Sequence, residues 1–401
     1  MNAPASAAAS ASAPAGLSAS VATHAPLPPP GRALPAWVYQ HPQMTRLEYE
    51  RIVRPSWQIL CHVNSIPRPG DYTTMSMGPD TLAAVRAADG TIRVFHNVCR
   101  HRGARLLDGT GHCSQAIVCP YHGWSYRLNG ELLATPVRES FPTLDRTQYG
   151  LKAVKSAVML GFVFACIEGD PPPLEDTWRR IAEELAPYRI EEMVPCGEPF
   201  LEVWEADWKI AMDNYLESYH VPIGHPGLNR MFTPDYDDQW HTPGVGRGVS
   251  WMRPQPSARL SERVYQSVVG QVSEALPEPN RRCWRFYSIL PNLGIDVFPE
   301  QMDFFQVLPL APGRCMIRSA QFAHPDSRRE AQLARRLGAR LNAQVNREDR
   351  ELCARVQQGL ASPSYEPGPL SGLECFMLEF HELLRARIPE VRLPRAPAQF
   401  A

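Results

Sequence analysis

The 401-residue sequence lacks an excess of charge of either sign, because 41 Lys and Arg side chains oppose 42 Asp and Glu, for a formal net charge of −1. Nucleic-acid scaffolds and proteins held on anionic lipid need a strong basic excess, so the balance argues against both classes. The sequence also lacks any apolar run of the roughly 18–20 residues that a membrane helix requires. We therefore expect neither a nucleic-acid partner nor a membrane span.

The first 35 residues contain little charge and little large apolar surface. Ala, Pro and Ser make up 24 of them, and the first charged side chain is Arg32. A secretory signal needs a basic segment ahead of its apolar core, which is missing here. Such a composition cannot offset its conformational entropy by burial, so we predict a disordered tail at residues 1–35. The 10 scattered Cys favour reduced thiols and a cytoplasmic location.

The rest of the chain divides into a β-rich module and a mixed region. Between about residues 57 and 168, short apolar runs alternate with hairpin signals, of which Asp89-Gly90 and Asn129-Gly130 are the clearest. A Pro cluster at 171–173 closes the module. Beyond it the patterns predict helices at 174–187, 208–220, 326–360 and 372–388, and strands at 284–290, 294–298, 304–308 and 315–322.

Two loops of the β-rich module each offer one thiolate and one imidazole. They are Cys99-Arg-His101 and Cys119-Pro-Tyr-His122, with 17 residues between His101 and Cys119. A cluster that has two Cys on one iron and two His on the other is a Rieske [2Fe-2S] centre. Structural zinc is the alternative, but zinc sites usually pair the cysteines in one loop and the histidines in another. The spacing favours the cluster over a zinc-stabilised binding module.

A second candidate metal site lies in the segment from Glu217 to His225. In a helix that continues to His220, Glu217 and His220 share one face. Pro222 and Gly224 then break the helix, so that His225 can return toward the same point. Two imidazoles and a carboxylate with open coordination positions bind Fe(II) and leave room for O₂.

The carboxylate of such a triad has to come from elsewhere in the chain. At about 100° per residue, Asp349 lies within roughly 40° of Val345 and Val356, inside the apolar stripe of the predicted helix 326–360. Its neighbours three and four residues away include no basic side chain. A buried carboxylate without a basic neighbour is costly unless it binds a metal or finds a tertiary partner. We therefore predict Asp349 as the third ligand; the weaker candidates are Asp296 and Asp303.

With these motifs the chain resembles the α subunits, or terminal oxygenases, of the Rieske non-haem iron ring-hydroxylating oxygenases. Cys-Arg-His-Arg-Gly and Cys-Pro-Tyr-His-Gly-Trp match the family motifs as written, and the resemblance covers approximately residues 35–390. It implies an α+β fold: an all-β Rieske domain followed by a helix-grip (START-like) catalytic domain with a central antiparallel sheet. The implied bounds are 36–56 for a helical segment on the catalytic domain, 57–170 for the Rieske domain and 171–401 for the catalytic domain.

The resemblance also implies cofactors, partners and a role for Glu217. Many members carry Asp three residues before the first iron His, where it bridges to a Rieske His of the neighbouring subunit. This chain carries Glu there, as does the branch that resembles carnitine, glycine-betaine and stachydrine monooxygenases. The cofactors implied are a [2Fe-2S] cluster held by Cys99, His101, Cys119 and His122, and mononuclear Fe(II) held by His220, His225 and Asp349. The partners implied are O₂, a small substrate, a flavin or ferredoxin-type NAD(P)H reductase and two further copies in a homotrimer.

The activity implied is oxygenation of a small organic substrate, with N-demethylation or C–N cleavage of a betaine-like compound favoured. The alternative is ring hydroxylation or demethylation of an aromatic acid. A Rieske electron carrier would need no second iron site. Aromatic side chains could cage a cation or stack on a ring, although most also suit core packing; the candidates are Trp240, Trp251, Trp284, Phe286, Phe298, Phe304 and Phe305. Arginines that could clamp a carboxylate are Arg247, Arg253, Arg259 and Arg263.

Overall fold

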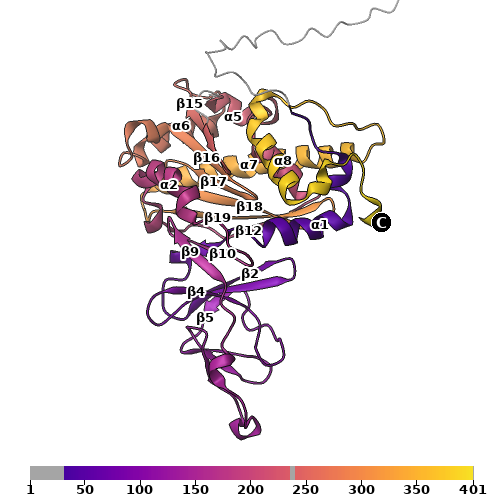
Figure 1. Cartoon of the computed structure of the whole chain (residues 1–401). Coiled ribbons are helices and arrows are strands. Elements are labelled where there is room, and N and C mark those ends of the chain that lie inside the picture. The colour runs from indigo at the N-terminus through magenta and orange to yellow at the C-terminus, as the bar shows by residue number, and fades with distance from the viewer. Residues whose placement is uncertain (1–30, 235–239, 401) are drawn as a thin grey trace, which may run out of the picture.

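The computed structural model describes residues 31–234 and 240–400. These residues form a smaller β unit, which lies below a larger unit built on one long sheet (Figure 1). The β unit spans β1 (Gln58–His62) to β10 (Phe162–Cys166), and the larger unit follows it along the chain. Among the described residues no helix is both long and apolar enough to cross a membrane.

The β unit consists of three small antiparallel sheets, ordered β4-β3-β2-β5, β6-β7-β8 and β1-β10-β9. Both predicted hairpins form: Gly90 turns between β3 and β4 with φ +82°, and Gly130 turns between β7 and β8 with φ +92°. The remaining strands of the unit are β2 (Asp71–Met77), β3 (Asp80–Arg86), β4 (Ile92–His96), β5 (Thr110–His112), β6 (Ala116–Val118), β7 (Ser125–Arg127), β8 (Leu132–Ala134) and β9 (Lys155–Met159).

The larger unit is built on a nine-stranded antiparallel sheet. Its main order is β11-β19-β18-β17-β16-β15-β13, while β12 pairs with β19 and β14 pairs with β15. Its strands are β11 (Val194–Pro195), β12 (Phe200–Trp204), β13 (Phe232–Pro234), β14 (Trp240–Thr242), β15 (Val245–Met252), β16 (Cys283–Ile289), β17 (Leu293–Val297), β18 (Met302–Ala311) and β19 (Arg314–Ala323).

The two faces of this sheet have different neighbours because strand side chains alternate. On β17, Leu293, Ile295 and Val297 pack with Phe162 and Phe164 of the β unit and with helix α2 (Leu174–Leu185). The opposite face carries Gly294 and Asp296. It is covered by α3 (Trp208–Tyr215), α5 (Pro226–Met231), α6 (Leu260–Val272), α7 (Arg329–Leu360) and α8 (Cys375–Arg387). The sheet therefore separates the β unit from the helical layer.

The start of the described chain differs from the prediction. Residues 1–30 lie outside the described residues, but the predicted tail extends too far at its other end, because Leu34 is completely buried and the Ala33 amide donates to Gly368 O at 3.0 Å. Helical turns follow at η1 (Ala36–Tyr39), α1 (Pro42–Glu48) and η2 (Tyr49–Val53), and they share a core with α3 and α8. Burial of Leu34 and hydrogen bonds to the segment 367–370 therefore hold residues 31–35 in place.

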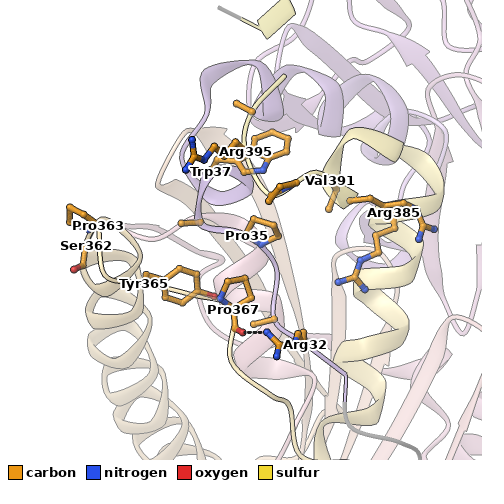
Figure 2. Close-up of a pocket in the computed structure, with 15 residues that line it drawn as sticks. Arg32, Pro35, Trp37, Ser362, Pro363, Tyr365, Pro367, Arg385, Val391 and Arg395 are labelled. Carbon is orange, nitrogen blue, oxygen red and sulfur yellow. Dashed lines mark hydrogen bonds between the residues drawn. The ribbon is translucent and has the colours of Figure 1, made fainter. Parts of the chain in front are cut away.

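A surface pocket of about 530 Å³ lies beside this N-terminal segment. Figure 2 shows that Arg32, Pro35 and Trp37 line it together with Tyr365 and C-terminal residues. None of the residues that the sequence predicts to bind a metal contributes to this pocket.

Candidate metal centres

The two Cys/His loops of the β unit fold in the same way. The Cys99 amide donates to Ala104 O at 2.8 Å, and the Gly103 amide donates back to Cys99 O at 3.0 Å. The equivalent bonds in the second loop run from Cys119 to Trp124 O at 2.8 Å and from the Gly123 amide to Cys119 O at 3.1 Å. Gly103 and Gly123 have φ of +75° and +71°, a region that costs glycine no steric penalty. Two matched turns therefore present the four predicted ligands.

The cysteine and histidine ends of these loops have different exposure. Cys99 and Cys119 are each 3% exposed, whereas His101 and His122 reach the surface with ring centroids 4.7 Å apart. Burial raises the pKa of the Cys99 thiol, although the Tyr126 hydroxyl at 3.2 Å favours the thiolate. His101 Nδ1 is buried and has no hydrogen-bond partner. Buried thiols beside an imidazole nitrogen without a partner suit a cluster that supplies the missing bond.

The second site forms from a turn and not from a helix face. Helix α3 ends at Tyr215, five residues short of the prediction, and α4 (Val221–Gly224) begins after His220. Glu217 joins the two, because its carboxylate accepts the His220 backbone amide at 3.1 Å and contacts His220 Nδ1 at 2.6 Å. The Glu217 side chain thus bridges the turn between the two helices. The predicted proximity of Glu217 and His220 holds, but its helical explanation is wrong.

His220, His225 and Asp349 converge on one point. Their ligand atoms all lie within 4.8 Å of one another, with His220 Nε2 3.2 Å from His225 Nε2. Asp349 Oδ1 lies 3.0 Å from His225 Nε2 and 3.6 Å from His220 Nε2. His225 and Asp349 are buried, on the loop before α5 and near the middle of α7.

The protonation of the two imidazoles argues for a metal at this point. Glu217 holds Nδ1 of His220, and Glu348 Oε2 holds Nδ1 of His225 at 2.9 Å. With a proton on each Nδ1, both Nε2 atoms direct lone pairs toward Asp349 Oδ1, which is buried and has no hydrogen-bond partner. Three lone pairs that face one another need a cation between them. The donor set of two imidazoles and one carboxylate suits Fe(II).

The pKa shifts of His220, His225 and Asp349 also favour positive charge at this point. Burial lowers the pKa of His220, but the neighbouring carboxylates of Asp349 and Glu217 outweigh it and raise that pKa to about 9. His225 shifts in the same direction for the same reasons. Burial opposes ionisation of Asp349, yet the two histidines hold the pKa of its carboxyl below the usual value. The carboxylates around the two imidazoles therefore favour positive charge at this point.

Sequence reasoning missed Glu348, because its contact with His225 carries no local signal. The weaker candidates lie elsewhere: Asp296 accepts from the Tyr215 hydroxyl at 2.5 Å, and Asp303 accepts from Asn342 Nδ2 at 3.2 Å. Neither belongs to the group of converging ligands.

The predicted pocket aromatics mostly pack into cores. Trp284 and Phe298 form a buried cluster with Tyr265, and Phe304 faces the β unit. Phe305 stacks on Tyr215 with centroids 5.2 Å apart, and Phe286 alone is partly accessible on the helical face. The Trp240 side chain lies outside the described residues.

The predicted arginine clamp does not form as a group. Arg247 binds Glu184, on the face of the sheet away from the triad. Arg253 donates to Asn229 O and Arg263 donates to Ser257 O, so both side chains are used in local structure.

Two family models match the chain. Residues 56–147 match the Rieske [2Fe-2S] domain, and residues 179–390 match the catalytic domain of the ring-hydroxylating alpha subunit. The second match covers the sheet, α3, α7 and the converging His220, His225 and Asp349.

One of the curated relatives extends over most of the chain, and another extends over a little more than half of it. The glycine betaine monooxygenase oxygenase subunit of Chromohalobacter salexigens is 30% identical over 368 residues, which cover 84% of this chain and 82% of the relative. The carnitine monooxygenase oxygenase subunit of Acinetobacter pittii is 30% identical over 233 residues, 58% of this chain and 61% of the relative. A crystal structure of the quaternary ammonium Rieske monooxygenase CntA has the same fold, with a TM-score of 0.75, 24% identity and coverage of 89% and 96%. This chain belongs to the ring-hydroxylating oxygenase alpha subunits and is a Rieske-type oxygenase with a [2Fe-2S] domain and a mononuclear iron catalytic domain.

Proposed function

We propose that this Rieske oxygenase acts on a small quaternary ammonium compound and removes an N-methyl group or cleaves a C–N bond. Its curated relatives are oxygenase subunits of glycine betaine and carnitine monooxygenases, which supports this class over an aromatic acid. The observation that carries the proposal is the pairing of the two Cys/His loops with the convergence of His220, His225 and Asp349 in one chain. An electron carrier would need only the loops.

The residues of both centres receive specific roles in this proposal. The cluster is held by Cys99, His101, Cys119 and His122, and the iron by His220, His225 and Asp349. When bound, these groups supply single electrons and the reductive activation of O₂. Glu217 and Glu348 keep a proton on Nδ1 of the two iron histidines, which directs each Nε2 lone pair to the metal.

We further propose that three copies assemble head to tail and that electrons cross between subunits through Glu217. Within one chain the nine-stranded sheet lies between the Rieske unit and the helical layer that carries the triad. The histidine side of the cluster loops reaches the surface, and Tyr121 beside it is 57% exposed. Near the triad, Tyr219 is 57% exposed and Ile223 is 82% exposed. Exposed apolar groups next to both centres suit a contact between copies.

The experiment measures turnover by the purified protein, to which a surrogate NAD(P)H reductase supplies the electrons. A panel of glycine betaine, carnitine, choline and aromatic acids is assayed for O₂ uptake and for released formaldehyde or aldehyde. We expect a Rieske visible spectrum, three irons per chain and turnover of a quaternary ammonium compound. Turnover of aromatic acids alone would overturn the substrate class, and a colourless zinc protein would overturn the whole proposal.

A further inference from the structure

One row of residues crosses the helical face of the sheet beside the triad. Cross-strand pairing places Gly248 opposite Phe286, Phe286 opposite Asp296, and Asp296 opposite Asp303. Residues directly opposite in antiparallel strands point to the same side. Asp296 shares that side with Gly294, against which Tyr215 of α3 packs. The row therefore faces the layer that carries His220 and Asp349.

This row borders open space, although the face around it is filled. A side chain at Gly248 would meet no atom within 4 Å, whereas one at Gly246 would strike Phe376 and one at Gly294 would strike Tyr215. Phe286 and Asp296 also keep accessible surface while most of β16 and β17 is buried. Among the described residues, a hollow over Gly248 thus adjoins Phe286 and Asp296, the next two positions of the row.

The two carboxyl groups of the row, those of Asp296 and Asp303, have no basic partner within the described part of the chain. Among the described residues, Asp296 accepts only the Tyr215 hydroxyl, and Asp303 accepts only the Asn342 amide. No described Lys, Arg or His forms an ion pair with either carboxyl, and burial raises the pKa of Asp296 to about 7 and that of Asp303 well above its usual value. When two carboxyls lie together, one holds a proton and the other keeps the charge. The Tyr215 hydroxyl, as a donor, stabilises the charge on Asp296.

The row also lies next to the iron ligands. Tyr215 is the last residue of α3, directly before the turn that carries Glu217 and His220. Asn342, which holds Asp303, precedes Asp349 on α7 by two helical turns, so the two side chains share one face about 10 Å apart along the axis. The Asp349 charge contributes to the raised pKa of Asp296.

We propose that Asp296 is the specificity-determining residue that selects a cationic substrate, with its carboxylate facing the ammonium head and Phe286 contacting the same head through its ring. This inference rests on the proposed function and adds a residue to it. A quaternary ammonium group donates no hydrogen bond, so it is recognised by charge and by ring faces. The Asp296 carboxylate supplies the charge, and the accessible ring of Phe286 supplies the ring face.

The test compares a cation with its neutral isostere. Dissociation constants are measured by calorimetry on the anaerobic holoenzyme for glycine betaine against 3,3-dimethylbutanoate and for choline against 3,3-dimethylbutan-1-ol. Each pair differs only in N⁺ versus C at the branched centre. We expect the holoenzyme to prefer the cation, and Asp296→Asn to reduce that preference at least tenfold without weakening the isostere.

Two variants keep the test specific. Asp303→Asn retains the Asp296 carboxylate and should retain the preference, and Asp326→Asn, in the exposed loop before α7, removes a remote charge as the matched control. The cluster absorbance of each variant shows that it has folded. If the wild type prefers the cation and Asp296→Asn prefers it equally, the inference is wrong while the proposed function stands. If the wild type neither prefers nor turns over any cation, the proposed function itself fails.

Discussion

His225 Nδ1 lies 2.9 Å from Glu348 Oε2, so the residue next to Asp349 in sequence holds the ring of His225, which converges with Asp349 in space. Glu217 makes the corresponding contact with His220 at 2.6 Å. Both imidazoles of the triad are therefore held by a carboxylate on the nitrogen away from the metal. Such outer contacts fix the tautomer and raise the basicity of the ligand.

Glu348→Ala should weaken Fe(II) binding about 10- to 100-fold, because outer-shell partners of ligating histidines have effects of that size. The measurement is the Fe(II) dissociation constant of the mononuclear site, with the cluster absorbance as an internal reference that should not change. Glu351→Ala on the same helix is the control, since Glu351 is exposed. Equal iron affinity in Glu348→Ala and the wild type would remove Glu348 from the site.

Asp349→Ala should empty the mononuclear site while the Rieske cluster stays loaded, because the variant loses the only carboxylate among the converging ligands of the described residues. Iron analysis should fall from three to two irons per chain. Asp303→Ala is the comparison, since Asp303 lies outside the converging group. If Asp303→Ala lost the iron and Asp349→Ala kept it, the ligand assignment would be reversed.

Substitutions in the two histidine pairs should have different effects, because one pair determines the visible spectrum of the cluster and the other is needed for turnover. His220→Ala is expected to keep the visible spectrum of the cluster and to lose oxygenation. His101→Ala should disturb the spectrum itself, because its buried Nδ1 has no other partner. Optical and electron paramagnetic resonance spectra of the two variants check this. Retained turnover in His220→Ala would contradict the assignment of the mononuclear site.

A site residue could be predicted from the sequence where a charged side chain departs from the local pattern of apolar side chains. Asp349 is predicted from an apolar stripe on a long helix, which the structure has at Arg329–Leu360. The stripe holds only in part, because Val356 is 50% exposed, but Asp349 is buried and converges with His220 and His225. The end of α3 could not be predicted, because Glu217 bridges the next turn with its side chain and the helical period continues past it. The Glu348–His225 contact joins residues that are 123 positions apart and depends on helix placement, whereas the Asp296–Asp303 pairing on neighbouring strands depends on strand register. No local propensity reports these contacts.

Lys209 supports the fold through a buried ion triad. Its ammonium lies 2.5 Å from Glu48 and 2.6 Å from Asp207, and all three side chains are nearly or completely buried. Lys209→Met leaves two buried carboxylates together and should cost about 3–5 kcal/mol, the usual cost of an uncompensated buried charge. Glu48→Gln should cost far less, because it leaves one Lys–Asp pair and because burial already raises the pKa of Glu48 to about 7. Denaturation midpoints compare the two; equal losses would contradict the charge argument.

Glu217→Gln tests the path between the two centres. The carboxylate contacts both the amide and Nδ1 of His220, and Gln can still accept from Nδ1 through its amide oxygen. The substitution therefore keeps the geometry of the iron ligand and removes the negative charge. We expect the rate at which the reduced cluster is oxidised in a single turnover with substrate and O₂ to fall at least tenfold.

Substrate affinity and iron content should stay near the wild-type values in Glu217→Gln, because neither depends on the removed charge alone. Glu217→Asp is the matched variant, since it keeps the charge and restores the acid that many family members carry at this position. It should recover more of the single-turnover rate than Gln does. If Glu217→Gln instead lost substrate affinity at an unchanged rate of cluster oxidation, Glu217 would belong to the substrate pocket and the electron path would run elsewhere.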